Sequence, residues 1–77
     1  MTNKIQWKPI LEMDLDDGTH TCYSAMDRDG CYVWLTQIAD DTWDVEQAYY
    51  YGGHIYTIVN CKTLTSAKRY AARYLNF

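Results

Sequence analysis

Five short stretches of this chain alternate apolar and polar side chains, and each is rich in β-branched or aromatic residues. Alternation with a period of two is typical of strands that bury one face. Dipeptides that favour turns separate the stretches. The sequence therefore predicts five strands, over residues 5–15, 19–27, 31–38, 43–51 and 54–61.

The spacing of apolar residues changes after Cys61. Thr63 is a favourable N-cap residue, and the residues after it have the period of an amphipathic helix as far as about Asn76. The predicted apolar side of this helix comprises Leu64, Ala67, Ala71, Tyr74 and Leu75. Because the connections between strands are short, we predict an α+β fold. It is a five-stranded antiparallel meander with one carboxy-terminal helix packed on one face, in a single domain over residues 1–77.

The connections between the strands also predict a register. They are the two-residue hairpin signals Asp17-Gly18, Asp29-Gly30 and Gly52-Gly53, and the two- or four-residue connection at 39–42. Opposite residues share a face, so the face under the helix is predicted to be Trp7, Leu11, Met13, Leu15, Cys22, Met26, Cys31, Val33, Leu35, Ala48, Tyr50, Ile55, Val59 and Cys61. Asp44 and Glu46 fall on this face as charged exceptions. Pro9 has no backbone donor and is expected on an edge strand.

The opposite face of the predicted sheet is aromatic. It collects Tyr23, Tyr32, Trp34, Ile38, Trp43, Val45, Tyr49, Tyr51, Tyr56 and Ile58, beside polar Thr21, Thr36 and Gln47. A helix about 10 Å wide is too narrow to cover both faces of a sheet roughly 24 Å across. We therefore expect at least part of the aromatic face to be exposed. The alternatives are a curled sheet that buries these aromatics on itself and a symmetric dimer.

Charged residues are sorted along the chain. All ten acidic residues lie between Glu12 and Glu46, whereas residues 47–77 contain no acid and carry four cations. The net charge is +2 over residues 1–11, −9 over residues 12–46 and +4 over residues 47–77, within an overall charge of −3. A small net charge thus hides two strong patches of opposite sign, which point to a charged macromolecule as partner.

Both the first and the third predicted turns are acidic, and in a meander they lie at the same end of the sheet. Their acids, here called the acidic rim, are Asp14, Asp16, Asp17, Asp40, Asp41 and Asp44. A row of carboxylates can imitate a nucleic-acid backbone and steer the chain to a basic groove of another protein. The alternatives are simple turn formation, which Asp favours, and a calcium site, although the EF-hand spacing is absent.

Two further groups of residues are candidates for binding. The aromatic face offers large side chains that suit partner anchoring: Tyr32, Trp34, Tyr49, Tyr51 and Tyr56. The predicted helix and the residues before it offer cations that suit nucleic-acid phosphates: Lys62, Lys68, Arg69 and Arg73. These cations equally suit the helix dipole and a solvated helix surface. The sequence lacks the aromatic motif of RNA-recognition motifs and the GxxG loop of KH domains.

Cysteine and histidine residues form no recognisable catalytic or metal-binding pattern. The three cysteines include no CxxC pair and leave one thiol over in any disulfide scheme, so we expect buried thiols in a reducing compartment. His20 and Cys22 share a predicted face, but core positions are the favoured interpretation. We expect no enzyme activity, no cofactor, no metal and no membrane segment. The expected location is the cytoplasm, that of the host cell if the protein is phage-encoded.

The chain is similar in the order of its features to many small phage and mobile-element accessory proteins, including anti-CRISPR and anti-restriction inhibitors. These features are an acidic hairpin sheet followed by Thr63-Leu64-Thr65-Ser66-Ala67-Lys68-Arg69-Tyr70-Ala71, with the pattern Leu-x-x-Ala-Lys-x-x-Ala. The resemblance implies a non-enzymatic inhibitor of a nucleic-acid-handling protein complex, one that occupies its DNA site.

The leading hypothesis is therefore an interaction protein that combines the acidic rim with exposed Tyr and Trp anchors. Its partner would be a protein that itself handles nucleic acid, and a homodimer is a further option. The alternative is a single-stranded nucleic-acid-binding module that uses the aromatic face together with the basic helix. Direct nucleic-acid binding is the less favoured of the two because the chain is acidic overall.

Overall fold

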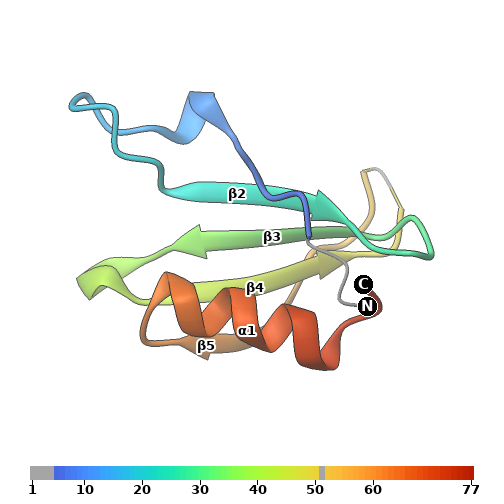
Figure 1. The fold of residues 1–77 in the computed structure, drawn as a ribbon. Helices are drawn as coiled ribbons and strands as arrows, with labels where there is room; N and C mark the ends of the chain where they lie inside the picture. Colours follow the sequence, from blue (N-terminus) through green and yellow to red (C-terminus); the bar gives the residue numbers. More distant parts are fainter. Residues whose placement is uncertain (1–4, 51) are drawn as a thin grey trace.

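The computed structural model describes residues 5–50 and 52–77, apart from the side chain of Asp40. Within these residues, five strands form one antiparallel sheet in the order β1-β2-β3-β4-β5, and a helix follows (Figure 1). The elements are β1 (Lys8–Pro9), the 3₁₀ helix η1 (Leu11–Met13), β2 (Cys22–Met26), β3 (Tyr32–Gln37), the 3₁₀ helix η2 (Ala39–Asp41), β4 (Trp43–Ala48), β5 (Tyr56–Cys61) and α1 (Leu64–Tyr74). The predicted α+β meander with one carboxy-terminal helix is confirmed.

The first strand is much shorter than the predicted range 5–15. Only Lys8 and Pro9 pair with β2, and Pro9 does lie on an edge strand. The chain then forms η1 and a local turn at Asp17-Gly18, which does not join β1 to β2 as a tight hairpin. Three side chains that were predicted in the core are therefore exposed: Leu11 (67%), Met13 (49%) and Leu15 (54%).

The register from β2 to β4 differs by one residue from the prediction. Ala25 lies opposite Val33, whereas a two-residue turn at Asp29-Gly30 would place Met26 there. Residues 28–30 form a three-residue loop instead, with Gly30 in the left-handed conformation (φ 82°) that ends such loops. Asp41 adopts the same conformation (φ 66°) in the β3–β4 connection. Because a slip of one residue exchanges the two faces of a strand, the predicted faces of β2 and β4 are wrong, whereas Val33 and Leu35 of β3 lie in the core as predicted.

In the observed register, Asp44 and Glu46 do not lie in the core. The face under α1 is built on Val33, Leu35 and Val45, which have no exposed surface. Residues predicted on the exposed aromatic face that instead pack into this core are Tyr23, Trp43, Val45 and Ile58. Residues predicted under the helix that instead lie on the opposite side of the sheet are Cys22, Met26 and Ala48, together with Asp44 and Glu46. Cys22 (5% exposed) and Ala48 (1% exposed) are nevertheless buried there.

Helix α1 begins where the sequence indicates. Thr63 caps it, because its side-chain oxygen accepts a hydrogen bond from the Ser66 N–H at 3.0 Å. The helix ends at Tyr74, two residues before the predicted end. Its contacts to the core come from Leu64, Ala67, Tyr70, Ala71 and Leu75. Tyr74 was predicted on this side but is 64% exposed, and Tyr70 takes its place.

Residues after α1 are hydrogen-bonded to the β2–β3 turn. The Asn76 carbonyl accepts a hydrogen bond from the Arg28 N–H at 2.8 Å, and its side-chain amide donates to Asp29 at 2.6 Å. Phe77 packs against Trp7 with 5.6 Å between ring centroids. These contacts hold α1 against the sheet. Among the described residues, no helix has both the length and the apolar character needed to cross a membrane.

Candidate functional site

The side of the sheet opposite α1, here called the open face, is not covered by any helix of the described chain (Figure 1). Strand pairing arranges its side chains in three rows: Met26, Tyr32 and Ala48; Lys8, Ser24, Trp34, Glu46 and Thr57; and Cys22, Thr36, Asp44 and Asn60. The first row is mostly apolar and the third is polar. The open face therefore changes from an aromatic end to an acidic end.

Tyr32 and Trp34 form the aromatic part of the open face. Their rings stack with 6.0 Å between centroids and 17° between planes. A hollow of about 500 Å³ lies against both rings and is also lined by Ala48, Ile55 and the Gly52-Gly53 turn. A second hollow of about 420 Å³ shares Tyr32 and extends toward β1. Both volumes lie within the range of about 300–1,000 Å³ that is typical of ligand pockets.

The acidic part of the open face is held in place by side-chain hydrogen bonds. The Thr36 hydroxyl donates to Glu46 at 2.7 Å, and the Asn60 amide donates to Asp44 at 2.9 Å. Glu46 lies directly opposite Trp34, so a carboxylate and a large aromatic ring are neighbours on the open face, both half-buried. The predicted register placed Glu46 under the helix, which is why sequence reasoning missed this pairing.

The two acidic connections lie at one end of the sheet, because Cys22 opens β2 opposite Thr36 near the end of β3 (Figure 1). Most described rim acids also stabilise local structure. Their hydrogen-bond partners are His20 for Asp14 (2.9 Å), the Thr19 N–H for Asp17 (2.9 Å), Gln37 for Asp41 (3.0 Å) and Asn60 for Asp44 (2.9 Å). Hydrogen bonds from Thr19 lower the pKa of Asp17, which keeps that exposed carboxylate ionised. The Asp40 side chain lies outside the described residues.

Exposed apolar side chains lie among these acids. Leu11, Met13 and Leu15 are about half exposed or more, and Ile38 is 44% exposed just before η2. Apolar side chains exposed together with charges are typical of protein-binding surfaces. The sequence pattern hid this feature, because the alternation in residues 5–15 is equally that of a half-buried strand.

The remaining predicted anchors form a separate group at the β4–β5 hairpin. Tyr49 and Tyr56 are 64% and 51% exposed, and their ring centroids are 6.0 Å apart. Tyr56 also contacts the His54 ring edge-on at 4.5 Å. Tyr51 lies outside the described residues. The structure thus brings Tyr32 together with Trp34, and Tyr49 together with Tyr56.

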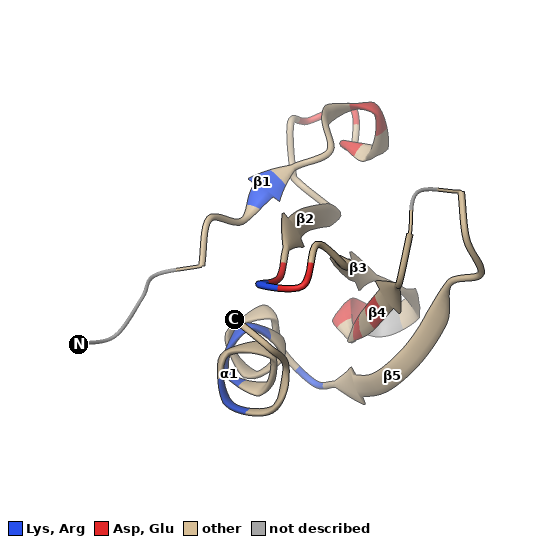
Figure 2. Cartoon of the chain, turned by 90° about the vertical axis from the view of Figure 1, so that its right-hand side faces the viewer, with Lys and Arg blue, Asp and Glu red and all other residues tan. Residues whose placement is uncertain are grey.

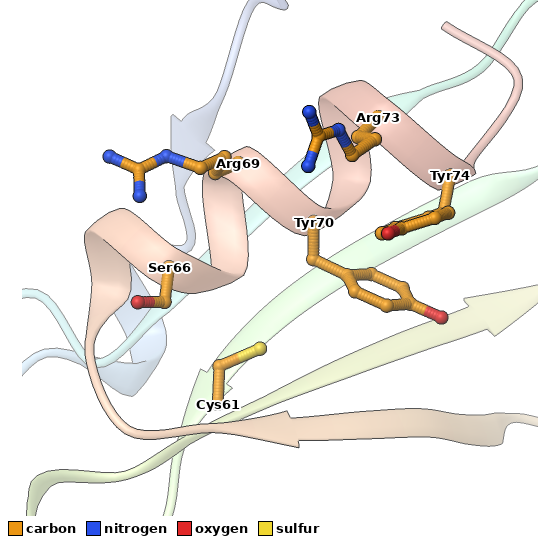
Figure 3. A pocket seen from close by; sticks show the side chains of 6 residues that line it. All are labelled: Cys61, Ser66, Arg69, Tyr70, Arg73 and Tyr74. Carbon is orange, nitrogen blue, oxygen red and sulfur yellow. The ribbon is translucent and has the colours of Figure 1, made fainter.

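The carboxy-terminal cations lie on α1 and just before it, on the side away from the open face. In Figure 2 most blue segments lie on α1 and on the connection that leads to it from β5, with others on β1 and in the β2–β3 turn, and the red segments lie in the loop after β1, in the β2–β3 turn and near β4. Lys68 lies 5.3 Å from the centroid of the Tyr23 ring, and Lys62 is exposed. Arg69 and Arg73 line one small pocket (Figure 3). The aromatic open face and the basic helix are therefore not parts of one continuous platform.

The described thiols and the His20 imidazole are not arranged for nucleophilic chemistry. Burial raises the pKa of Cys22, Cys31 and Cys61, so all three thiols are protonated at neutral pH. The Cys22 thiol contacts the Thr36 hydroxyl at 3.4 Å, while His20 bonds to Asp14. In the part of the chain that the structure describes, no three His, Cys, Asp or Glu side chains cluster as metal ligands.

The surfaces with functional potential are thus the open face, the acidic rim with its exposed apolar side chains, and the arginine pocket of α1. No protein-family model, curated protein or solved structure matches this chain, so its function is inferred from these surfaces alone.

Proposed function

We propose that this protein is a non-enzymatic interaction protein that binds a nucleic-acid-handling protein through its open face and acidic rim. The observation that carries the proposal is the Tyr32–Trp34 stack, which lies half-buried on the open face in the same row of side chains as Glu46. Large aromatic rings next to a carboxylate suit a partner surface that presents apolar groups together with Arg or Lys. A basic nucleic-acid-binding groove has that chemistry.

The stacked rings supply the expected binding energy. Truncating a Tyr or Trp side chain at the centre of an interface to Ala weakens the binding free energy by about 2 kcal/mol or more. This is roughly a 30-fold loss of affinity. The hollows of about 500 Å³ and about 420 Å³ beside Tyr32 can receive side chains of the partner. Because the two rings already contact each other, little side-chain freedom is lost on binding.

The acids supply steering and specificity. Asp44 of the acidic rim and Glu46 both lie on the open face, and no Lys or Arg among the described side chains lies within 4.0 Å of a described carboxylate. This negative surface is therefore not neutralised from within the chain. It attracts a basic partner at long range and competes with nucleic acid for the same groove, which is how the protein would act as an inhibitor.

The thiol and histidine geometry supports a binding role rather than catalysis. Protonated thiols are poor nucleophiles, the Cys22 thiol contacts Thr36, and the His20 ring is hydrogen-bonded to Asp14. A single-stranded nucleic-acid module that joins the aromatic face to α1 has less support, since these surfaces lie on opposite sides of the sheet.

A comparative pull-down tests the proposal. Tagged protein is incubated with nuclease-treated lysate of the cells that make it, and bound proteins are quantified by mass spectrometry. We expect one near-stoichiometric partner that binds nucleic acid, with capture reduced at least tenfold by Trp34→Ala and by Glu46→Gln. The matched control is Tyr74→Ala, which removes an exposed aromatic ring from the opposite side. Equal capture by all four proteins contradicts the proposal.

Kinetics then test the role of charge. With the purified partner, Asp16→Lys combined with Glu46→Lys should lower the association rate and flatten its dependence on salt, because exposed charges steer encounters until salt screens them. Unchanged association rates in this variant would rule out electrostatic steering.

A further inference from the structure

Arg69 and Arg73 form a cationic pair on α1. Their spacing of four residues places them on the same side of the helix, and Figure 3 shows both guanidinium groups on that side. Helix α1 contains no acidic residue, and no described carboxylate lies within 4.0 Å of either arginine. Like charges at this spacing repel each other, so an anion between them would relieve that repulsion.

The pocket beside these arginines offers further hydrogen-bond donors. It is lined by Cys61 of β5 and, along α1, by Ser66, Arg69, Tyr70, Arg73 and Tyr74 (Figure 3). The Ser66 hydroxyl oxygen accepts a hydrogen bond from the Thr63 hydroxyl at 2.9 Å, which leaves the Ser66 hydrogen available to donate. Burial keeps the Cys61 thiol neutral by raising its pKa, so no negative charge lines the pocket.

The size of the pocket limits what it can hold. Its volume is about 190 Å³, below the range of about 300–1,000 Å³ that drug-sized ligands occupy. One tetrahedral oxyanion fits this size, and guanidinium groups match the oxygens of a phosphate with paired hydrogen bonds. Tyr74 is 64% exposed at the mouth, with its ring 4.8 Å from that of Tyr70.

We propose that Arg69, Arg73 and Ser66 form a binding site for one phosphate group, free in solution or carried by a nucleic-acid strand. Lys68 takes no part in it, because its ammonium group lies over Tyr23. The site is on the opposite side of the sheet from the open face. It is therefore independent of the proposed protein-binding function, and either can fail without the other.

Nuclear magnetic resonance of the arginine Nε–H groups tests the site directly. Inorganic phosphate is titrated at constant ionic strength while the side-chain signals are followed. We expect saturable shifts at Arg69 and Arg73, and at least a tenfold loss of affinity in Arg69→Gln and in Arg73→Gln. Arg28→Gln is the matched control, since Arg28 is exposed in the β2–β3 turn, and its affinity should equal that of wild type. Backbone spectra confirm that each variant is folded.

Two results would overturn the proposal: shifts that grow linearly without saturation, or affinity that is unchanged in Arg69→Gln. A second titration identifies the source of the phosphate. If a short oligothymidylate displaces inorganic phosphate from the two arginines, the site takes a strand phosphate. If phosphate saturates the site and the oligonucleotide does not displace it, the site takes free phosphate.

Discussion

The two faces of this sheet carry different side chains although they share one backbone. Val45 and Glu46 are neighbours on β4, yet Val45 is fully buried under α1 whereas Glu46 lies on the open face beside Trp34. The covered face is aliphatic at its centre and is closed by Ala67 and Ala71 of the helix. The open face combines stacked aromatic rings, carboxylates and hollows. The residues with no exposed surface lie on the covered face and on the helix, whereas the proposed binding site lies on the open face.

The largest expected difference between the faces is in stability. Leu35→Ala removes a fully buried side chain at the centre of the core and should lower the free energy of unfolding by about 2–5 kcal/mol. Because domains of this kind have only about 5–15 kcal/mol in total, this is a large fraction. Urea denaturation measures it. Thr36 is the next residue along β3 and lies on the open face, so Thr36→Ala should lower the free energy of unfolding much less. Equal decreases in the two variants would contradict the division between the faces.

A smaller loss of stability is expected from a substitution in the β2–β3 turn, which determines the register and therefore the two faces. Asp27 is only 7% exposed and accepts hydrogen bonds from the N–H groups of Asp29 (2.9 Å) and Cys31 (2.8 Å) and from Gln47 (3.2 Å). Asp27→Ala leaves these donors without a partner and should cost about 1–3 kcal/mol in urea denaturation. Asp16→Ala, at an exposed rim acid, should change stability by less than about 0.5 kcal/mol.

These turns also explain why the sequence predicts the fold but not the faces. Strand number, order and the helix follow from the alternation and from Thr63. The faces depend on loop length, and Asp29-Gly30 is compatible with both a two-residue turn and a three-residue loop. The charged exceptions Asp44 and Glu46 were the available signal: a shift of one residue moves both out of the core.

The candidate site was predictable to a different extent. Acidic turns at one end of the sheet follow from the meander. The Trp34–Glu46 pairing and the exposed loop with Leu11 could not be derived, because both require the observed register and the short β1. The pocket of Arg69 and Arg73 depends on Cys61 packing beneath the helix, a tertiary contact that helix periodicity does not contain.

The N-cap of α1 should contribute moderately to the stability of the protein. Thr63→Ala removes the acceptor for the Ser66 N–H and should destabilise the protein by about 1 kcal/mol. Thermal unfolding followed by circular dichroism measures this effect. Thr65→Ala is the control, since Thr65 is exposed within the first turn of α1 and does not cap it. A similar loss in both variants would show that capping is not the cause.

The smallest effect on stability is expected from a substitution beside the acidic rim. Hydrogen bonds from Thr19 lower the pKa of Asp17 in the folded state, so their contribution to stability is present above the ordinary pKa of aspartate, about 3.9, and is lost as pH falls through the lowered value. Thr19→Ala should raise the pKa of Asp17 toward its ordinary value in a carbon-detected NMR titration. An unchanged pKa would show that the Thr19 side chain does not cause the shift.

Side-chain footprinting tests the division between a binding face and a structural face most directly. The complex recovered from nuclease-treated lysate and the free protein are oxidised by hydroxyl radicals, and modification of Trp34, Tyr32 and Tyr74 is quantified by mass spectrometry. If the open face binds the partner, oxidation of Trp34 and Tyr32 falls several-fold in the complex while Tyr74 is unchanged. Protection of Tyr74 with no change at Trp34 would contradict the account and move the binding surface to α1.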